Sequence, residues 1–579
     1  MFRRAKSPHS AKPIGGSRLR HEGTASSDAG GIARPMTRRQ RVVDAATTRG
    51  FRLPPRRGEY AVESSIPVVA RDGARLLTEH FAPQGRALGT VVMRSPYQRV
   101  GVMSEMLGGL FASRGYHVVL QSCRGTFGSD GDYIPGVAEI DDGADTLVWL
   151  RKQAWYDGRL AAVGGSALSY SMWAMLMDPP EELVAVAAVA SFHDPFAVTH
   201  GDGAFALQNN YTVASGMAGQ QQRGRIGTLG ELLRTNRQGP ALAALPVADA
   251  AERFVGPASA WYRDIAIRDD PADPYWQAQD ATRAVDHLQA PVRLIAGWQD
   301  VFLVQTLDEY RRLRDRGTPV ALTVGPWTHF EMASRGGRRV FSELVHWVDG
   351  QAAGYVERPA DDPVAYYVTG GGGWRSAPDW PPQTQDQILY LAPGGSLTPT
   401  APTPTAPPVV FTYDPSDPTP TIGGRILSVR AGYQLDSDLA RRPDTVALVS
   451  TPLREPLEMI GVPEVTLTHR CDNPHFDLWV RISEVRPDGR SRNVTETFRG
   501  APHAGVDGRI WLAMDPAAHR FAAGSRIGLL IGGGSFPRYA RNLGTPGSRT
   551  AGTELAVSRH VIALAAGAST LSLPVSQLS

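Results

Sequence analysis

A serine follows two glycines directly after an apolar run, in the segment Val163-Gly164-Gly165-Ser166. The residues Leu160–Val163 predict a buried strand, and the residues Ala167–Met177 predict a helix that begins at once. A tight turn between a strand and a helix lifts a serine hydroxyl clear of a sheet, where it can attack an electrophile. Small residues are needed there because such a turn is strained. The segment therefore predicts a sheet with flanking helices and a nucleophilic Ser166.

Strand and helix signals alternate from about residue 58 to residue 200. The predicted strands are Thr90–Met93, Val118–Leu120, Leu160–Val163 and Val184–Ser191, and the predicted helices between them are Met103–Ser113 and Asp141–Ala154. Residues 198–288 are polar and helix-prone, and then strands return at Val292–Ala296 and Val320–Val324 around a helix from Val304 to Arg316. This alternation predicts a doubly wound parallel sheet with helices on both faces. An insertion at the carboxyl edge of such a sheet is well placed to cover a site.

Two strand ends supply partners for the serine. Asp300 follows one strand and His329 follows the next, and ligands of doubly wound sheets bind at these carboxyl ends. The order Ser166, Asp300, His329 is the chain order of the α/β-hydrolases. We expect His329 to accept the Ser166 proton while Asp300 fixes its tautomer. His200, beside Asp202, is the alternative base and otherwise a pocket residue.

An oxyanion hole needs two donors aimed at the developing charge. We expect the backbone N–H of Ala167 to be one donor, because it opens a helix. The phenol of Tyr97, just beyond the strand at residues 90–93, is expected to be the other. The substrate pocket is expected to include four further side chains, namely Trp298, Phe302, His200 and Asp202.

Eight segments of the chain resemble the cocaine esterase-like serine hydrolases, which are related to X-prolyl dipeptidyl peptidases and α-amino-acid ester hydrolases. The segments are Arg94–Tyr97, Arg124–Gly131, Gln153–Gly158, Gly164–Ser166, Gly297–Asp300, Gly325–His329, Tyr413–Pro418 and Ser535–Asn542. The resemblance covers nearly everything after residue 58. It implies the fold inferred above, the triad Ser166, Asp300 and His329, the oxyanion hydroxyl of Tyr97, and no metal or organic cofactor.

Three positions depart from that family's pattern. Ala167 stands where the family usually has Tyr, Ser169 where it has Gly, and Cys123 where it has Thr. The backbone donor of residue 167 survives any side chain, so the missing ring is expected to reshape the pocket floor and to leave catalysis intact.

The pattern divides the chain into four parts. Residues 1–57 are expected to be a basic, disordered tail, residues 58–197 and 289–354 an α/β-hydrolase catalytic domain, and residues 198–288 a helical cap. Residues 355–579 contain short β-rich runs between Gly, Pro and Asp, beginning at Ala365–Val368, and predict a jelly-roll β-sandwich.

The net charge of +3 hides the basic amino-terminal part. Residues 1–57 hold 14 Lys and Arg against 3 Asp and Glu, so the rest of the chain is acidic and a nucleic-acid enzyme is disfavoured. That part lacks the apolar stretch of a secretory signal, and a true start at Met36 or a transit peptide are the alternatives to a tail. No apolar run is long enough to span a membrane. Two distant cysteines, Cys123 and Cys471, favour reduced thiols in a cytoplasmic protein.

Three functions remain open from the sequence. The first is a serine esterase that cleaves small carboxylic esters, with amides as an extension, through an acyl-enzyme. The second is an X-prolyl dipeptidyl peptidase or amino-ester hydrolase, which must bind a free ammonium group with carboxylates such as Asp194 or Asp202. The apolar residues 301–303 after Asp300 favour the first. The third is a binding protein without catalysis. The sequence leaves the oligomeric state open.

Overall fold

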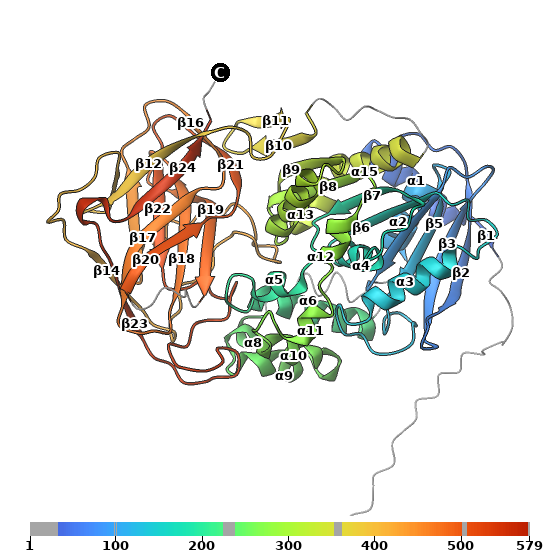
Figure 1. The fold of residues 1–579 in the computed structure, drawn as a ribbon, viewed down its shortest axis with the longest axis horizontal. Coiled ribbons are helices and arrows are strands. Elements are labelled where there is room, and N and C mark those ends of the chain that lie inside the picture. The colour runs from blue at the N-terminus through green and yellow to red at the C-terminus, as the bar shows by residue number, and fades with distance from the viewer. Residues whose placement is uncertain are drawn as a thin grey trace, which may run out of the picture.

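The structure is a computed structural model of the chain, and it describes residues 33–97, 99, 101–223, 238–352, 362–500 and 507–576. Figure 1 shows a body of mixed helices and strands beside an all-β body, with a group of short helices below both. The first body holds the amino-terminal part of the chain and the second the carboxyl-terminal part.

The first body is built on a sheet in which eleven strands are described, in the order β1-β2-β3-β5-β4-β6-β7-β8-β9-β10-β11. Neighbouring strands from β5 to β10 are parallel, whereas β1, β2, β3 and β11 pair antiparallel. Their bounds are β1 Arg34–Pro35, β2 Tyr60–Val69, β3 Arg75–Pro83, β4 Thr90–Ser95, β5 His117–Ser122, β6 Leu160–Gly165, β7 Leu183–Val189, β8 Val292–Gln299, β9 Val320–Thr328, β10 Val364–Val368 and β11 Gly373–Ala377. The predicted α/β class is confirmed.

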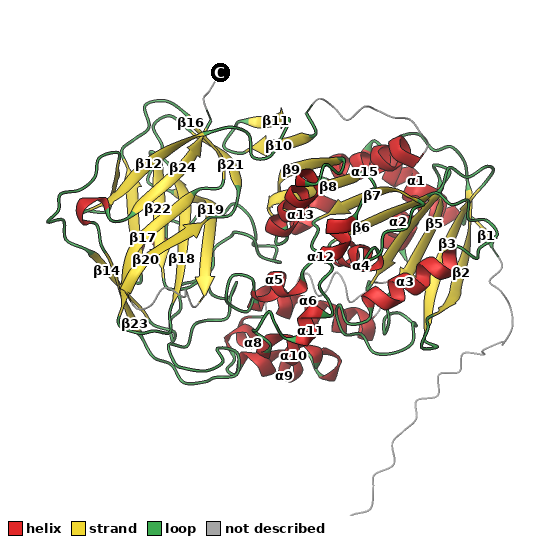
Figure 2. Ribbon diagram, in the orientation of Figure 1, coloured by secondary structure: helices red, strands yellow, loops and turns green. Residues whose placement is uncertain are grey.

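Helices cover both faces of this sheet (Figure 2). Their bounds are α1 Arg38–Phe51, α2 Val102–Ala112, α3 Glu139–Leu150, α4 Ala167–Met175, α13 Leu303–Asp315, α14 His329–Ala333 and α15 Gly337–Ala352. On one face the core contains Trp173 of α4 and Leu313 of α13. On the other face it contains Phe111 of α2 and Val345 of α15. The sheet is therefore buried on both sides, as parallel strands require.

The prediction of a disordered tail over residues 1–57 is wrong for its second half. A capping box of Thr37 and Gln40 begins helix α1, and Met36 is buried. Asp44 of α1 is buried as well, where it pairs with Arg56 at 2.8 Å and accepts a hydrogen bond from Ser113. These contacts reach across the fold, so the basic composition of the segment did not reveal them. Residues 1–32 lie outside the described residues.

The segment between β7 and β8 forms the group of short helices. Their bounds are α5 Pro195–His200, α6 Leu207–Arg223, α8 Gly239–Ala243, α9 Ala250–Phe254, α10 Trp261–Ile267, α11 Pro274–Gln277 and α12 Thr282–His287, with 3-10 turns at Val247–Asp249 and Pro257–Ser259. They bury a core of their own that includes Phe205, Tyr262 and Trp276, together with Ala540 from the second body. Residues 224–237 of this helix-prone segment lie outside the described residues.

The second body is an all-β sandwich, as predicted. Its described strands are β12 Gln385–Ala392, β13 Ser396–Thr398, β14 Val409–Tyr413, β15 Thr445–Ser450, β16 Leu457–Gly461, β17 Glu464–Cys471, β18 Asp477–Val485, β19 Ser491–Gly500, β20 Asp507–Ala513, β21 Ala517–Phe521, β22 Arg526–Gly532, β23 Ser558–Ile562 and β24 Thr570–Val575. Alternate residues such as Leu467, Val480 and Phe521 form its core.

The run Ala365–Val368 was predicted as the first strand of the sandwich, and this is wrong. The run lies in β10, which extends the first sheet in parallel beside β9, with Tyr366 opposite Val324. Farther along, the ring of Trp380 lies 5.1 Å from that of Trp298 on β8. A short run of tyrosine and valine predicts a strand but does not show which sheet that strand joins.

No helix in the described part of the chain is long and apolar enough to cross a membrane. Both cysteines, Cys123 and Cys471, are buried free thiols.

Candidate active site

Ser166 occupies the sharp turn between β6 and α4. Its backbone is left-handed, with φ of 58° and ψ of −129°, and its N–H donates to the carbonyl of Val189 on β7 at 2.9 Å. A Cβ on Gly164 would lie 2.5 Å from the carbonyl oxygen of Leu168, so only glycine fits that position. At Gly165 a Cβ would make ordinary contacts at 3.6 Å. The turn thus holds a strained serine at the carboxyl end of the sheet.

His329 and Asp300 meet this serine from two other strand ends. The Nε2 atom of His329 lies 3.0 Å from Ser166 Oγ, and its Nδ1 atom lies 2.7 Å from Asp300 Oδ1. Asp300 directly follows β8 and is fully buried, whereas His329 begins α14 directly after β9. A capping box of Thr328 and Glu331 fixes the start of α14. The structure therefore brings together the three side chains predicted from the strand ends.

The hydrogen bonds determine what this arrangement can do. A carboxylate only accepts, so His329 donates through Nδ1 to Asp300, and its Nε2 is left to accept the Ser166 proton. A serine that shares its proton with an imidazole can attack a carbonyl carbon.

The two predicted oxyanion donors lie beside the serine. Burial raises the pKa of Tyr97, and a hydrogen bond with the Ser166 side chain acts in the opposite direction, so the phenol keeps its proton at neutral pH. The backbone of Tyr97 is held by its own N–H, which donates to Ser95 Oγ at 3.1 Å. Ala167 opens α4, and N–H groups in the first turn of a helix have no helical acceptor. Both groups can donate to a negative oxygen.

Ser169 has a structural role that the sequence did not predict. Its side chain is buried, and its hydroxyl donates to the carbonyl of Ser166 at 2.6 Å. Its backbone N–H donates to the same carbonyl at 2.8 Å. A residue without a hydroxyl, such as the glycine of the similar family, would leave only the backbone bond. Ser169 thus stabilises the strained turn from its helix side.

Of the four predicted pocket residues, Phe302 lies at the site. Its ring is perpendicular to that of His329, with centroids 5.4 Å apart, and stacks on Phe192 at 4.5 Å. Phe192 in turn stacks on Tyr170 at 5.4 Å. These rings form a continuous apolar wall beside the proposed base.

Trp298 does not line the site. Its side chain is buried in the core on one face of the sheet, and its Nε1 donates to the carbonyl of Tyr367 at 2.7 Å. Successive side chains of a strand point to opposite faces, and Trp298 belongs to the face that packs on Trp380.

His200 and Asp202 also lie away from the serine. His200 is buried in the helical cap, donates to the carbonyl of Ile265 at 2.7 Å and stacks on Phe196, and burial lowers its pKa. Asp202 accepts a hydrogen bond from the hydroxyl of Tyr539 in the sandwich. Contacts that the sequence does not reveal, within the group of short helices for His200 and with the sandwich for Asp202, engage both side chains.

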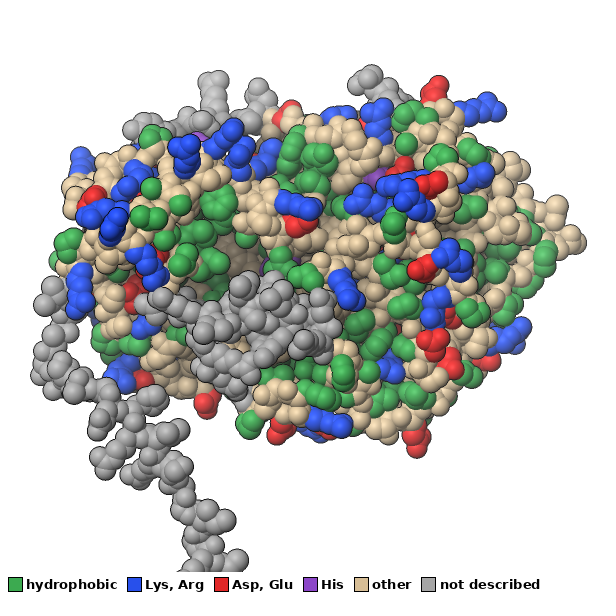
Figure 3. All heavy atoms as spheres, turned by 180° about the vertical axis from the view of Figure 1, so that it is seen from behind, with side chains coloured by type: hydrophobic (Ala, Val, Ile, Leu, Met, Phe, Trp, Pro, Cys, Tyr) green, Lys and Arg blue, Asp and Glu red, His purple; other side chains and the backbone are tan. Residues whose placement is uncertain are grey.

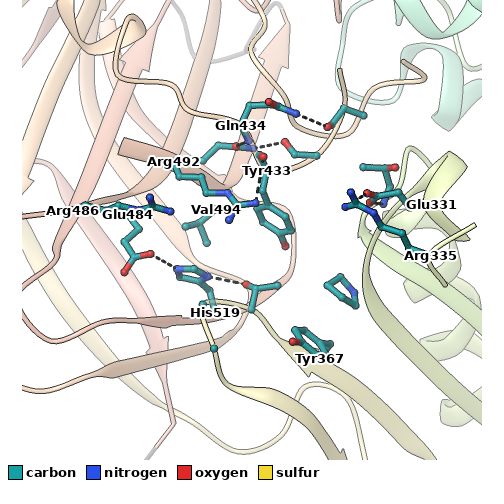
Figure 4. A pocket seen from close by; sticks show the side chains of 18 of the residues that line it. Glu331, Arg335, Tyr367, Tyr433, Gln434, Glu484, Arg486, Arg492, Val494 and His519 are labelled. Carbon is teal, nitrogen blue, oxygen red and sulfur yellow. Dashed lines mark hydrogen bonds and ion pairs between the residues drawn. The ribbon is translucent and has the colours of Figure 1, made fainter. Parts of the chain in front are cut away.

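Among the described residues, two of the cavities lie against the sandwich. The larger of these has a volume of about 1060 Å³ and lies between α14 and the sandwich, with Glu331 on one side and Val494 on the other (Figure 4). Thr328 and Phe330, the neighbours of His329, also line it. The smaller, of about 700 Å³, lies between the cap and the sandwich and includes His200. Ser166 lines neither of them. Figure 3 shows the molecule from behind, with basic and apolar side chains interspersed over its described surface.

Comparisons with known proteins find relatives along most of the chain. Residues 72–331 match the family model for the X-Pro dipeptidyl-peptidase (S15 family), and residues 359–571 match that for the X-Pro dipeptidyl-peptidase C-terminal non-catalytic domain. Over 540 residues the chain is 26% identical to the cocaine esterase of Rhodococcus sp. (strain MB1 Bresler), which covers 85% of this chain and 94% of that protein.

Two solved structures share the fold over nearly the whole chain. An α-amino acid ester hydrolase superposes with a TM-score of 0.75 at 20% identity, covering 90% of this chain and 97% of its own. An aminopeptidase from a Thaumarchaeota archaeon superposes with a TM-score of 0.73 at 20% identity, covering 90% of this chain and 98% of its own. At this identity the likeness establishes the arrangement of the two bodies.

Proposed function

The chain belongs to the serine-hydrolase family of cocaine esterase and the X-Pro dipeptidyl peptidases, and on that premise we propose that it is an esterase acting on small carboxylic esters. The observation that carries the proposal is the line of hydrogen bonds from Ser166 through His329 to the buried Asp300. In this proposal the three residues form a catalytic triad.

The reaction begins when Ser166 Oγ attacks the ester carbonyl carbon. His329 Nε2 takes the hydroxyl proton, and Asp300 stays ionised and stabilises the imidazolium. The carbonyl oxygen becomes negative and accepts hydrogen bonds from the Tyr97 hydroxyl and the Ala167 N–H.

His329 then gives its proton to the departing alcohol, which leaves the acyl group on Ser166. A water molecule attacks this acyl-enzyme with His329 again acting as base, and the carboxylic acid is released. Amides follow the same steps with a poorer leaving group.

An uncharged acyl group fits the surroundings of the proposed base. The wall of Phe302 and Phe192 is apolar. A substrate ammonium group would need a free carboxylate, and Asp202 is engaged by Tyr539 near the buried Arg538. Asp194, the other candidate anchor, accepts the N–H of Ala197 at the start of α5, and burial raises its pKa. These contacts favour an esterase over a dipeptidyl peptidase. Two buried free thiols are consistent with a cytoplasmic location.

Labelling with a fluorophosphonate tests whether Ser166 is the nucleophile. We expect one adduct, on Ser166, and loss of p-nitrophenyl ester hydrolysis by about 10⁴-fold or more in Ser166→Ala. Folded protein without an adduct would refute both enzymatic hypotheses and leave the binding protein.

A substrate panel separates the two enzymatic hypotheses. Short-chain p-nitrophenyl esters are expected to give higher kcat/KM than Xaa-Pro p-nitroanilides. The reverse order would identify the peptidase, which the name of the matching family model favours.

A further inference from the structure

The residues on either side of Asp300 are held by the carboxyl-terminal sandwich. Before it, the buried side-chain amide of Gln299 donates to the carbonyl of Val494 on β19 at 3.1 Å. After it, the carbonyl of Val301 accepts a hydrogen bond from Arg425 Nη1 at 3.4 Å. The loop that carries the proposed catalytic acid is thus attached to the sandwich at two points.

Asp300 has few other restraints of its own. Its N–H donates to the carbonyl of Gly297 at 3.0 Å, its carbonyl accepts from the N–H of Leu303 at 3.2 Å, and its Oδ1 accepts from His329. Its Oδ2 is buried and has no hydrogen-bond partner among the described residues. In the absence of a second side-chain partner, the direction of the carboxylate depends on the backbone of residues 299–301.

Arg425 is itself fixed in place. Its Nε and Nη2 atoms form a paired ionic contact with the two carboxylate oxygens of Asp515, at 2.6 and 2.5 Å. Only 8% of its side chain is exposed. The carbonyl of Asp515 accepts a hydrogen bond from the Thr495 hydroxyl, and Arg538 lies 3.8 Å from its carboxylate. A planar guanidinium held by two bonds has a defined direction for its remaining N–H groups.

Gln299 is held in a similar way. Besides its bond to Val494, it interacts with the hydroxyl of Tyr433, whose pKa burial raises to about 12. Tyr433 lines the large cavity shown in Figure 4, and its hydroxyl also interacts with Thr369, which is hydrogen bonded to His519 at 2.8 Å. Both points of attachment therefore come from ordered, mostly buried parts of the sandwich.

We propose that Arg425 is a positioning residue for the reaction: through Asp515 on one side and the Val301 carbonyl on the other, it fixes Asp300 against His329. The inference rests on the proposed function. It assigns to the sandwich a part in catalysis, although no sandwich residue touches the substrate in this mechanism.

The test compares Arg425→Met with a matched variant, Arg549→Met. Arg549 also forms a paired, largely buried contact with an aspartate of the sandwich, Asp477, at 2.8 and 2.9 Å. None of its described contacts reaches residues 297–303. Kinetics with a p-nitrophenyl ester and thermal unfolding are measured for both variants and for the unmodified protein.

Arg425→Met is expected to lower kcat by about 10- to 100-fold with KM within about twofold, because a displaced catalytic group costs rate more than ground-state binding. Arg549→Met is expected to keep kcat while losing comparable thermal stability. Arg425→Lys separates the ion pair with Asp515 from the hydrogen bond to the Val301 carbonyl. Lysine keeps the charge beside Asp515 but lacks the fork that reaches Val301, so we expect stability to recover and kcat to stay low.

Recovery of kcat in Arg425→Lys, or equal kcat in both methionine variants, would reduce Arg425 to a structural ion pair. If Arg425→Met does not fold, Arg425→Lys carries the test alone, and a kcat equal to that of the unmodified protein in this variant would overturn the proposal. An unmodified protein that neither labels at Ser166 nor hydrolyses esters would refute the proposed function, and this inference with it. Activity in the unmodified protein with full activity in Arg425→Met would refute only the inference.

Discussion

Single side chains around the turn after β6 show how closely the proposed site is specified. Gly164 has no room for a Cβ, and Ser166 adopts a left-handed backbone that other residues avoid. Ser169 stabilises this strained backbone by donating two hydrogen bonds to the carbonyl of Ser166, one from its hydroxyl and one from its N–H. The hydroxyl of residue 169, where similar hydrolases usually have glycine, therefore adds a side-chain hydrogen bond to the turn.

Tyr97 is expected to matter for the transition state alone. Tyr97→Phe removes one oxyanion donor, and loss of one such donor typically lowers kcat by about 10²- to 10³-fold. KM should change little, because the negative charge exists only after attack. Steady-state hydrolysis of p-nitrophenyl esters measures both constants.

Tyr133→Phe is the control for that variant. Tyr133 is half-buried, desolvation raises the pKa of its phenol, and it is close enough to Tyr97 to interact with it electrostatically. Its loss should leave kcat within about threefold, since no described hydrogen bond joins it to Ser166. A Tyr97→Phe enzyme with normal kcat would show that the oxyanion is stabilised by backbone donors only.

Strand ends were readable from the sequence, and side-chain directions were not. Ser166, Asp300 and His329 could be predicted because each follows an apolar run at one edge of a parallel sheet. Trp298 stands only two residues before Asp300, yet it points into the core. Arg425 could not be predicted, because it comes from a loop more than a hundred residues away whose packing no local pattern encodes.

At the scale of elements, the sequence pattern did not predict helix α1 and assigned strand β10 to the wrong sheet. Helix α1 is polar along most of its length and is held by the ion pair of Asp44 and Arg56. Strand β10 has the alternation of a strand, but its register with β9 is set by tertiary packing. By contrast, the predicted strands that correspond to β4 to β9 and the predicted helices that correspond to α2, α3, α4 and α13 lie within a few residues of their observed bounds, whereas β2, β3 and α15 were not predicted.

Strand β23 contains a histidine that should make stability depend on pH. Burial, followed by the neighbouring His469, lowers the pKa of His560 to about 3, and its ring stacks on Phe411 at 4.4 Å. Between pH 6.5 and pH 3 the unfolded chain binds a proton here that the folded chain does not. The free energy of unfolding should therefore decrease as the pH is lowered from 6.5 to 3. This residue contributes up to about 1.4 kcal/mol per pH unit to the decrease.

Urea unfolding at several pH values between 7 and 4.5 measures this slope. His560→Gln is expected to flatten it, whereas His346→Gln, at an exposed position of α15, should leave it unchanged. Parallel slopes for all three proteins would show that His560 takes up its proton in the folded state.

At the scale of the whole molecule, the catalytic sheet is completed by the segment that leads into the sandwich. Val364, Tyr366 and Val368 of β10 are buried, and Trp380 covers Trp298. Burial of side chains of this size stabilises a fold by roughly 1.5–3 kcal/mol each, so together they match a large part of the stability of a typical domain.

A chain ended after residue 352 is therefore expected to be insoluble or unfolded. A chain ended after residue 383 keeps β10, β11 and Trp380 and should be more soluble, but it lacks Arg425 and Val494. We expect its ester hydrolysis to be at least about 100-fold below that of the full chain. Circular dichroism and activity of the soluble fraction test both statements, and full activity in either truncated chain would contradict them.

The hydrogen bond from Arg425 to the Val301 carbonyl has a consequence for protein engineering. Exchanging sandwiches between related hydrolases is an obvious way to build hybrid enzymes, since the two bodies look separable in outline (Figure 1). A hybrid without counterparts of Arg425 and Asp515 would keep the serine and the histidine in place. Its residue at the position of Asp300 would no longer be held against the histidine. A working hybrid should therefore take residues 299–301 and their sandwich partners, Arg425 and Val494, from the same parent protein.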